Sequence, residues 1–315
     1  MCAVRERGRT SIGLVSSVTA RAPAKMNLAL RVGPPGADGY HPVATVYHAV
    51  SLYEEVTVAP AEALVVEVAG PGVEGVPTDA TNLAARAVEL LARHVSRPPA
   101  VRIRITKGVP VAGGMAGGSA DAAAALVACD ALWGTRIGRG GLAGLAARLG
   151  SDVPFCLAGG TALGAGRGER LTPVLVRGRA HWVFALAFGG LSTPDVYARL
   201  DRLRGDHEVH RPAVDDAVVA ALAAGDLPAL GAALVNDLQP AAISLHSGLR
   251  ATLASGREAG ALGAVVSGSG PTCAFLARDE EHALDLAVTL SASGTCRTVA
   301  RAHGPVAGAT VIAPQ

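Results

Sequence analysis

Strand-like and helix-like spacings of apolar residues alternate along the first half of the chain. Apolar residues largely alternate with others over Val18–Val32 and Val101–Thr106, which predicts half-buried strands. Over Asn82–Val95 they recur at helical spacing, which predicts an amphipathic helix with Thr81 or Asn82 as its N-cap. Similar patterns predict strands over Val46–Val58 and Ala63–Ala69 and helices over Ser119–Trp133 and Gly141–Leu149.

The second half opens with a strongly apolar stretch, His181–Phe188, that predicts a strand. Further helices are predicted over Pro194–Leu203, Val214–Ala224, Leu227–Leu238, His246–Ala259 and Glu280–Ser291, and strands over Ala264–Val266, Thr272–Ala277 and Thr295–Ala302. Strands and helices that mix without regular alternation favour an α+β fold of two domains with a cleft between them. We expect a disordered leader at residues 1–17, an N-terminal domain at 18–178 and a C-terminal domain at 179–315.

The composition is that of an ordinary globular protein. Half of the 315 residues are hydrophobic, 17% are charged and the formal net charge is +2, so charge gives no reason to expect a nucleic acid or a membrane as partner. No apolar run has the length of a membrane span, and Met1–Ser17 lacks the features of a secretion signal. The five cysteines, at positions 2, 129, 156, 273 and 296, have no paired spacing, which predicts buried free thiols in a reducing cytoplasm.

A glycine-rich stretch, Pro110–Ala120, joins a predicted strand to a predicted helix. A glycine loop that opens a helix directs several backbone N–H groups and the positive end of the helix dipole at one point, which favours a phosphate. The stretch lacks the lysine of the common phosphate-loop motif and the spacing of the dinucleotide fingerprint. It predicts phosphate binding, and a tight turn that lets strand and helix pack closely is the alternative.

Lysine is rare in this chain. Of 28 basic residues only Lys25 and Lys107 are lysines, and both lie beside candidate motifs. A lysine delivers a compact charge into a tight site, which the planar arginine side chain does not. The scarcity therefore marks Lys25 as a candidate functional residue, with chance as the alternative.

Three ordered blocks carry a family resemblance: Pro23–Leu28, Pro110–Ala124 and Val265–Phe275. Together they resemble the three motifs of the superfamily of galactokinase, homoserine kinase, mevalonate kinase and phosphomevalonate kinase. Within it the chain is similar to the kinases of 4-diphosphocytidyl-2-C-methyl-D-erythritol, on the segments Asp38–His41, Leu149–Pro154 and Gly164–Pro173. The resemblance implies a two-domain small-molecule kinase fold, and transfer of the ATP γ-phosphate to the 2-hydroxyl of that cytidyl-linked compound with magnesium.

The resemblance implies that Lys25 and Asp152 form the catalytic pair. A carboxylate can accept the proton of the attacking hydroxyl, and an adjacent ammonium keeps the carboxylate ionised. For Asp152 the alternative is a helix cap in Ser-Asp-Val-Pro, and for Lys25 it is a solvated charge on a strand.

On the nucleotide side, the resemblance places the glycine-rich stretch around the ATP phosphates and two further residues near the adenine. Ser119 is a candidate ligand of phosphate or Mg²⁺, or a simple N-cap. The glutamate with which some relatives bind magnesium has no clear counterpart in this chain. Lys107 could instead be a surface charge at a strand end. The predicted nucleotide-binding residues are Pro110, Val111, Ala112, Gly113, Gly114, Met115, Ala116, Gly117, Gly118, Ser119, Ala120, Lys107 and Asn82.

On the acceptor side, the resemblance implies that Tyr40 and His41 contact the cytidine and that Tyr197 supplies a second aromatic face. Aromatic stacking with hydrogen bonds suits a cytosine ring. A turn role for His41 and a core contact for Tyr197 remain alternatives. Asn27 is expected to orient the methylerythritol end of the substrate.

The remaining expectations concern function and partners. We expect a cytoplasmic enzyme with a small-molecule substrate, no nucleic acid or membrane partner, and a monomeric or weakly homodimeric state. The alternatives are another alcohol kinase of the superfamily, acting on homoserine, mevalonate or a sugar, and a non-catalytic nucleotide-binding regulator.

Overall fold

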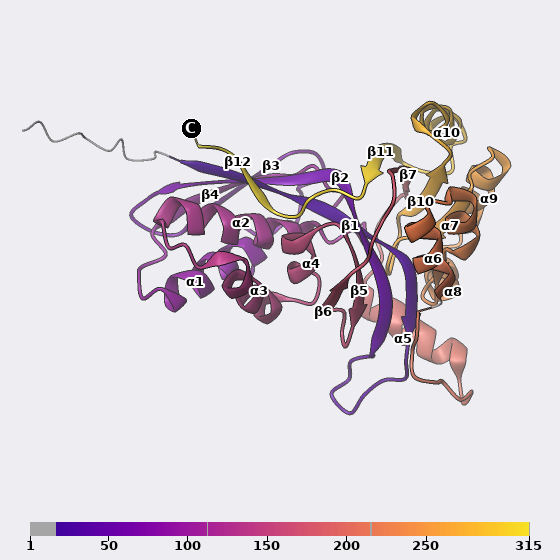
Figure 1. Ribbon diagram of the computed structural model, residues 1–315, viewed down its shortest axis with the longest axis horizontal. Helices are drawn as coiled ribbons and strands as arrows, with labels where there is room; N and C mark the ends of the chain where they lie inside the picture. The colour runs from indigo at the N-terminus through magenta and orange to yellow at the C-terminus, as the bar shows by residue number, and fades with distance from the viewer. Residues whose placement is uncertain (1–16, 112, 215, 315) are drawn as a thin grey trace, which may run out of the picture.

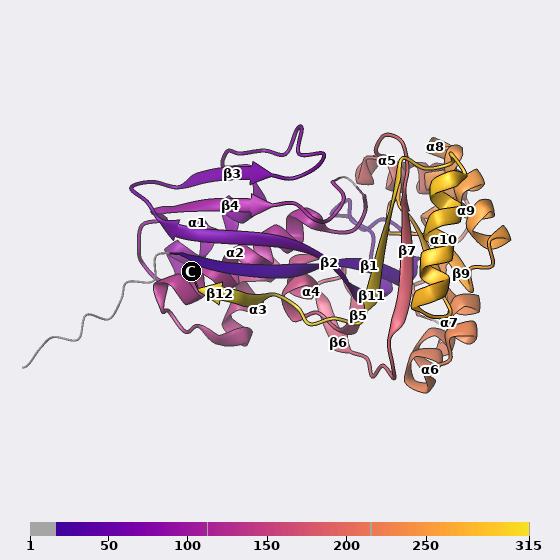
Figure 2. The ribbon, with the colours of Figure 1, turned by 90° about the horizontal axis from the view of Figure 1, so that it is seen from above.

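The computed structural model describes residues 17–111, 113–214 and 216–314, which form two lobes side by side (Figure 1). The predicted leader, except for Ser17, and Ala112 of the glycine-rich stretch lie outside these residues. In the N-terminal lobe, helices cover one face of the sheet (Figure 1). Most helices of the second lobe lie on the side of its sheet that faces away from the first lobe (Figure 2).

Within the described residues, the large sheet has eight strands. Its main order is β12–β1–β2–β4–β3, with β5 beside β2, β6 beside β5, and β8 beside β1. The strands are β1 (Val18–Val32), β2 (Val43–Pro60), β3 (Val65–Ala69), β4 (Val101–Thr106), β5 (Thr161–Ala165), β6 (Arg170–Pro173), β8 (Val235–Asn236) and β12 (Thr310–Pro314). The helices on its face are α1 (Leu83–His94), α2 (Gly117–Trp133), α3 (Gly138–Leu149) and α4 (Val153–Ala158).

The second lobe is built on a four-stranded antiparallel sheet of order β11–β7–β10–β9 in the described part of the chain. Its strands are β7 (Ala180–Leu186), β9 (Gly263–Val266), β10 (Cys273–Ala277) and β11 (Thr298–Gly304). Its helices are α5 (Thr193–Arg204), α6 (Asp216–Ala224), α7 (Leu227–Ala233), α8 (Gln239–Leu245), α9 (Gly248–Glu258) and α10 (Glu280–Ala292).

Strand β1 connects the cores of the two lobes. The prediction of a half-buried strand is wrong for its central part, because residues 22–30 are all buried. Met26 and Leu28 belong to the same apolar cluster as Trp182 and Phe184 of β7, while Ala20 and Ala22 belong to the cluster under α1 and α2. Each lobe therefore covers a different part of β1.

The long hairpin of β1 and β2 is irregular where it passes the centre of the molecule. The register of the two strands shifts between Pro23 and Ala24 and again between Asn27 and Ala29. Such bulges bend a strand and redirect its side chains. Lys25 lies between the two irregularities, so its position depends on this local distortion.

Most predicted elements exist, with shifted ends, but the predicted helix Leu227–Leu238 is wrong in its last part. Helix α7 ends at Ala233, and Val235–Asn236 pairs in parallel with Ala29–Leu30 as β8. Strand β12 was not predicted, and it pairs with β1. Both strands belong to the range predicted as the C-terminal domain, yet they complete the sheet of the N-terminal lobe. The division of the chain at residue 178 remains a prediction.

The described cysteines, Cys129, Cys156, Cys273 and Cys296, are free and buried, which confirms the prediction for these four. Burial raises the pKa of each thiol, to about 12 for Cys273. They are therefore neutral core side chains at physiological pH and unsuited to act as nucleophiles.

Candidate active site

A pocket of about 250 Å³, here called the inner pocket, is walled by both lobes. Lys25 of β1, Asp152 at the start of α4 and Gly114 of the glycine-rich stretch contribute from the first lobe. Thr193 at the start of α5 and Gly268 contribute from the second. The two residues predicted as a catalytic pair therefore line one cavity between the lobes.

Lys25 is a buried charge, so the alternative of a solvated strand charge is wrong. Its ammonium donates to Asn27 Oδ1 at 2.9 Å, and Asn27 Nδ2 donates to Thr45 Oγ1 at 2.7 Å. Thr45 in turn donates to the carbonyl of Ala29 at 2.6 Å. This chain of hydrogen bonds fixes the direction in which the ammonium points into the pocket.

Asp152 faces Lys25 across the pocket. Lys25 Nζ lies 3.6 Å from Asp152 Oδ2, and the carboxylate side chain keeps 26% of its surface exposed. Asp152 occupies the N-cap position of α4, but its side chain makes no capping hydrogen bond there. The carboxylate is therefore directed into the pocket and available for chemistry.

Tyr47 is a site residue that sequence reasoning missed. Its hydroxyl donates to Asp152 Oδ1 at 3.1 Å, and the ammonium of Lys25 lies 5.5 Å from its ring centroid. Burial, followed by the charge of Asp152, raises the pKa of Tyr47 well above its usual value. Gly164 and Gly168 lie under the Tyr47 side chain, where an added Cβ would come within 2.6 and 2.2 Å of it. Those glycines thus make room for the tyrosine.

The glycine-rich stretch connects strand β4 to helix α2, as predicted. Helix α2 begins at Gly117, and its N-cap, Ala116, has left-handed backbone angles with φ at 61°. The first amides of a helix have no intrahelical partner and suit an anion. The amide of Lys25 donates to the carbonyl of Met115 at 3.1 Å, which fixes the loop to the strand that carries the ammonium.

A cavity of about 430 Å³, here called the loop pocket, lies along this stretch. Asn82, Lys107 and Asp121 line it together with residues from Pro110 to Gly118. Ala120 is fully buried, and Ser119 is half-buried; neither is among the described residues that line this pocket. The glycine-rich stretch therefore presents its part up to Gly118 to the cavity, and helix α2 adds Asp121.

Ser119 is the third residue of α2, so the interpretation of Ser119 as N-cap is wrong. As a ligand of Mg²⁺ it remains a prediction. The described residues contain no group of three or more histidine, cysteine, aspartate or glutamate side chains that could hold a metal ion. A magnesium ion at this loop would depend mainly on phosphate and water oxygens.

Lys107 is buried, so the alternative of a surface charge is wrong. Its ammonium lies 2.7 Å from Glu54 Oε1 and 2.6 Å from Asp121 Oδ2, and Glu54 Oε2 accepts from the amide of Gly108. Burial of Glu54, followed by the charge of Asp121, raises the pKa of Glu54 to about 7 against the opposing effect of Lys107. The cluster ties β2, β4 and α2 together beside Gly117, whose Cβ position lies 2.8 Å from Glu54 Oε1.

Asn82 confirms one of the two predicted helix caps. Its Oδ1 accepts from the amides of Ala84 and Ala85, and its Nδ2 donates to the carbonyl of Pro77 at 2.7 Å. Each of its side-chain polar atoms is thus engaged within the protein. A contact with adenine remains a prediction.

The second glycine segment, Ser267–Pro271, meets the first one. A Cβ on Gly114 would lie 2.6 Å from the carbonyl oxygen of Ser267, and one on Gly268 would lie 3.1 Å from the carbonyl oxygen of Gly114. Asn236 of β8, which the sequence did not single out, donates to the carbonyls of Val266 and Gly268 at 2.7 Å. Close backbone approach explains why glycine is required at both positions.

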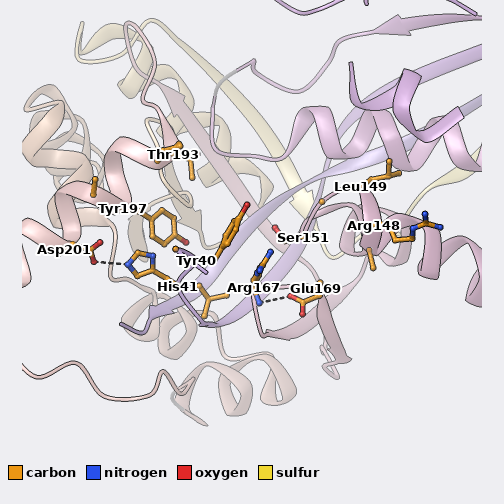
Figure 3. Close-up of a pocket in the computed structure, with 16 residues that line it drawn as sticks. Tyr40, His41, Arg148, Leu149, Ser151, Arg167, Glu169, Thr193, Tyr197 and Asp201 are labelled. Carbon is orange, nitrogen blue, oxygen red and sulfur yellow. Dashed lines mark hydrogen bonds and ion pairs between the residues drawn. The ribbon is translucent and has the colours of Figure 1, made fainter. Parts of the chain in front are cut away.

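A larger cavity of about 1180 Å³, here called the outer cavity, adjoins the inner pocket, and Tyr40, His41 and Tyr197 line it (Figure 3). The rings of His41 and Tyr197 lie 5.0 Å apart, and His41 Nε2 lies 2.9 Å from Asp201 Oδ1. Tyr40 is 57% exposed and Tyr197 is half-buried. The structure brings three of the four predicted acceptor-side residues together in this cavity, although they come from a loop and a helix far apart in sequence; the fourth, Asn27, lines the inner pocket.

Comparison with known proteins agrees with this arrangement. The family described as GHMP kinases N terminal domain matches residues 82–160, and GHMP kinases C terminal matches residues 218–296. The 4-diphosphocytidyl-2-C-methyl-D-erythritol kinase of Thermobifida fusca strain YX is 60% identical over 305 residues, which cover 94% of this chain and 99% of the relative. The kinase of the same name from Streptomyces coelicolor is 58% identical over 297 residues, which cover 94% and 99%. The chain belongs to this kinase family.

A solved structure gives the same answer for the fold. The crystal structure of a 4-(cytidine 5'-diphospho)-2C-methyl-D-erythritol kinase superposes with a TM-score of 0.74 at 32% identity, and covers 90% of this chain and 98% of that one. The predicted α+β fold of two domains, with an active site in the cleft between them, is therefore confirmed, as is the prediction of an ATP-dependent kinase. Across the described residues of this kinase, none of the helices has the length and apolarity to cross a membrane.

Proposed function

We propose that this kinase transfers the γ-phosphate of ATP to the 2-hydroxyl of 4-diphosphocytidyl-2-C-methyl-D-erythritol, a step of non-mevalonate isoprenoid precursor synthesis. The proposal depends on the continuity of three cavities. The inner pocket shares Gly114 and Ala116 with the loop pocket, and it shares Ser151 and Tyr197 with the outer cavity. A nucleotide on the loop and a cytidyl compound in the outer cavity would meet in the inner pocket. The names of the relatives support the same substrate.

In this proposal, Asp152 accepts the proton of the attacking hydroxyl, and Lys25 orients that hydroxyl. An alcohol is a poor nucleophile, and a positioned base contributes about 10²–10⁴ in rate. The 3.6 Å separation of the two charges leaves each of them free to contact the substrate oxygen. The Tyr47 hydroxyl, hydrogen-bonded to Asp152 Oδ1, would hold the carboxylate in place from behind.

Most of the remaining acceleration would come from alignment and charge neutralisation. The transition state of phosphoryl transfer is loose, and its charge lies on phosphate oxygens. The exposed amides at the start of α2 would bind those oxygens, with the ammonium of Lys25 close by. Mg²⁺, when bound, would supply further neutralisation, and Ser119 is the candidate protein ligand.

On the acceptor side, cytosine would stack between Tyr40 and Tyr197, with His41 at its polar edge. A ring with two aromatic neighbours and a hydrogen-bonding partner is recognised by shape and by polarity. Asp201 beside His41 would set the orientation of the imidazole. Asn27, fixed by Thr45, would contact the methylerythritol end.

An ADP-release assay with the purified protein tests the proposal. It compares the cytidyl compound, homoserine, mevalonate and a sugar at equal concentrations, with the Asp152→Asn variant as background. We expect turnover with the cytidyl compound alone. Turnover with a different alcohol instead would indicate another kinase of the superfamily, and ATP binding without turnover would indicate a nucleotide-binding regulator.

We also propose that the enzyme works in the cytoplasm as a monomer or weak homodimer. The small net charge of +2 supports the expectation that it has neither nucleic acid nor membrane as partner. Sedimentation velocity at micromolar concentration measures the oligomeric state directly.

A further inference from the structure

Arg167 lies at the junction of the inner pocket and the outer cavity. Among the described residues, five line both cavities: Val43, Ser151, Arg167, Thr193 and Tyr197. Arg167 is the cation among these five, and it comes from the turn between β5 and β6. A ligand that extends from one cavity into the other would therefore pass near this side chain.

The guanidinium of Arg167 is held in a defined orientation by the opposite loop. Its Nη2 lies 2.7 Å from Asp38 Oδ2, and its carbon lies 3.8 Å from the ring centroid of Tyr40. The backbone on either side is also fixed, because the amide of Arg167 donates to Glu169 Oε2 and the amide of Tyr40 donates to Asp38 Oδ1. In Figure 3 the Tyr40 ring stands between Arg167 and Tyr197.

These contacts leave part of the guanidinium available. Both side chains of the ion pair are about half exposed, 50% for Arg167 and 55% for Asp38. A guanidinium has five N–H donors in a planar fork, and the pair with Asp38 engages it through Nη2. The remaining donors can make a bidentate contact with phosphate oxygens, which is the geometry that arginine favours.

The proposed substrate has a diphosphate between its cytosine and its methylerythritol. If the reacting hydroxyl lies near Lys25 and Asp152 while the cytosine lies near Tyr40 and Tyr197, the diphosphate crosses the junction at Arg167. We propose that Arg167 binds the diphosphate of the substrate and that Asp38 is the positioning residue that orients it. This inference rests on the proposed function and adds a residue to its substrate site.

The test compares CDP with cytidine, which differ in the diphosphate alone. Binding of both is measured by calorimetry with a saturating non-hydrolysable ATP analogue, so that CDP cannot occupy the loop pocket. We expect Arg167→Met to weaken CDP binding about tenfold to a hundredfold more than it weakens cytidine binding, the range for charged hydrogen bonds. The variant also loses the contact between Arg167 and the Tyr40 ring. That loss should weaken the binding of CDP and of cytidine by the same factor, so it cancels in the ratio of the two affinities.

Three further variants sharpen the comparison. Arg167→Lys should keep part of the CDP preference, because the charge remains and the fork is lost. Asp38→Asn should reduce the preference for CDP over cytidine by a smaller factor than Arg167→Met does. The matched control is Arg170→Met. Arg170 lies three positions further along the chain, in β6, and lines none of the three cavities. This variant should leave the ratio of CDP affinity to cytidine affinity unchanged.

Kinetics give a second readout. Arg167→Met should raise the KM for the cytidyl substrate, with the KM for ATP unchanged and kcat reduced by less than the change in KM. Equal effects of Arg167→Met on CDP and cytidine, or no effect on either, would overturn this inference and leave the proposed function standing. A wild-type protein that binds neither CDP nor cytidine would contradict the proposed function itself.

Discussion

Lys25 Nζ lies 3.6 Å from Asp152 Oδ2, with both side chains on the wall of one pocket between the lobes. The ammonium donates a hydrogen bond to Asn27 Oδ1 at 2.9 Å, whereas its contact with the carboxylate is a longer ion pair. The two charges are thus close enough to influence each other and to contact the same oxygen atom beside them. This geometry suits a pair that acts on a hydroxyl.

Asp152→Asn should lower kcat about 10²- to 10⁴-fold, because an amide cannot accept the hydroxyl proton. Binding of ATP should change little, since Asp152 is not among the residues that line the loop pocket. Single-turnover kinetics and calorimetry with ATP measure the two effects. Asp285→Asn, at an exposed position of α10, is the control and should behave as wild type. Normal turnover of the Asp152 variant would remove this residue from the mechanism.

Lys25→Arg should lower kcat about 100-fold, the effect expected when reacting groups are misplaced by about 1 Å. The charge is kept, but a planar guanidinium does not fit a buried position that has Asn27 Oδ1 at 2.9 Å and Asp152 Oδ2 at 3.6 Å from the ammonium. Steady-state kinetics measure the loss, and Arg104→Lys, at an exposed position of β4, is the control for the exchange itself. Near-normal activity would show that a lysine is not required here.

Tyr47→Phe should lower kcat about tenfold and leave both KM values close to wild type. The change removes the hydroxyl that contacts Asp152 Oδ1 at 3.1 Å, and hydrogen bonds to charged groups contribute about 1.5–3 kcal/mol. The ring contact with Phe155, at a centroid distance of 4.9 Å, is retained. Tyr53→Phe on the same strand is the matched variant. If both variants have the same kcat, the hydroxyl of Tyr47 has no role in catalysis.

Gly268→Ala should reduce kcat, whereas Gly260→Ala should not. Both glycines have left-handed φ angles, 56° and 87°, so alanine should cost about 1–2 kcal/mol of stability at each. The new methyl at Gly268 would lie 3.1 Å from the carbonyl oxygen of Gly114 and 3.5 Å from Lys25 Nζ, while at Gly260 the nearest atom is at 3.8 Å, in His282. Chemical unfolding and kinetics separate the two effects. Equal activity of the variants would contradict the predicted contact.

Glu54→Gln should change the pH dependence of stability. The pKa of Glu54 is about 7 in the folded protein against an ordinary 4.5, so the folded state binds the proton more tightly. Stability from this group is therefore fully present below pH 4.5 and is lost as the pH rises to about 7. Relative to the glutamine variant, the wild type should lose on the order of 3 kcal/mol over this range. Urea unfolding at several pH values measures the difference, and a difference that stays flat would refute the assignment.

The sequence predicted well what is encoded locally. The alternation of Val101–Thr106, the glycine-rich stretch and the alanine-rich run after it gave a strand, a loop and a helix in the right order, because each depends on neighbours in the chain. The same holds for the cap at Asn82. The catalytic pair was predicted from motif resemblance, and its roles remain predictions until the variants are measured.

Pairing between strands that lie far apart in the chain could not be predicted from the sequence. Strand β8 has two residues and forms only because β1 offers a free edge at Ala29 and Leu30. Tyr47 and Glu54 gave no signal because they lie on an ordinary strand pattern, and they gain a role from Asp152 and Lys107 on other elements. The environment of an ionisable side chain is set by what packs around it.

The chain by itself determined the kinase family, the order of its motifs and the residue types that are predicted to contact phosphate and cytosine. Tertiary structure decided which lysine lies in the inner pocket and which stabilises the loop. Lys25 faces a carboxylate that is partly open to the pocket, whereas Lys107 is enclosed by two buried carboxylates. The physical reason is burial: the same ammonium is a catalytic candidate beside a cavity and a structural tie inside the core.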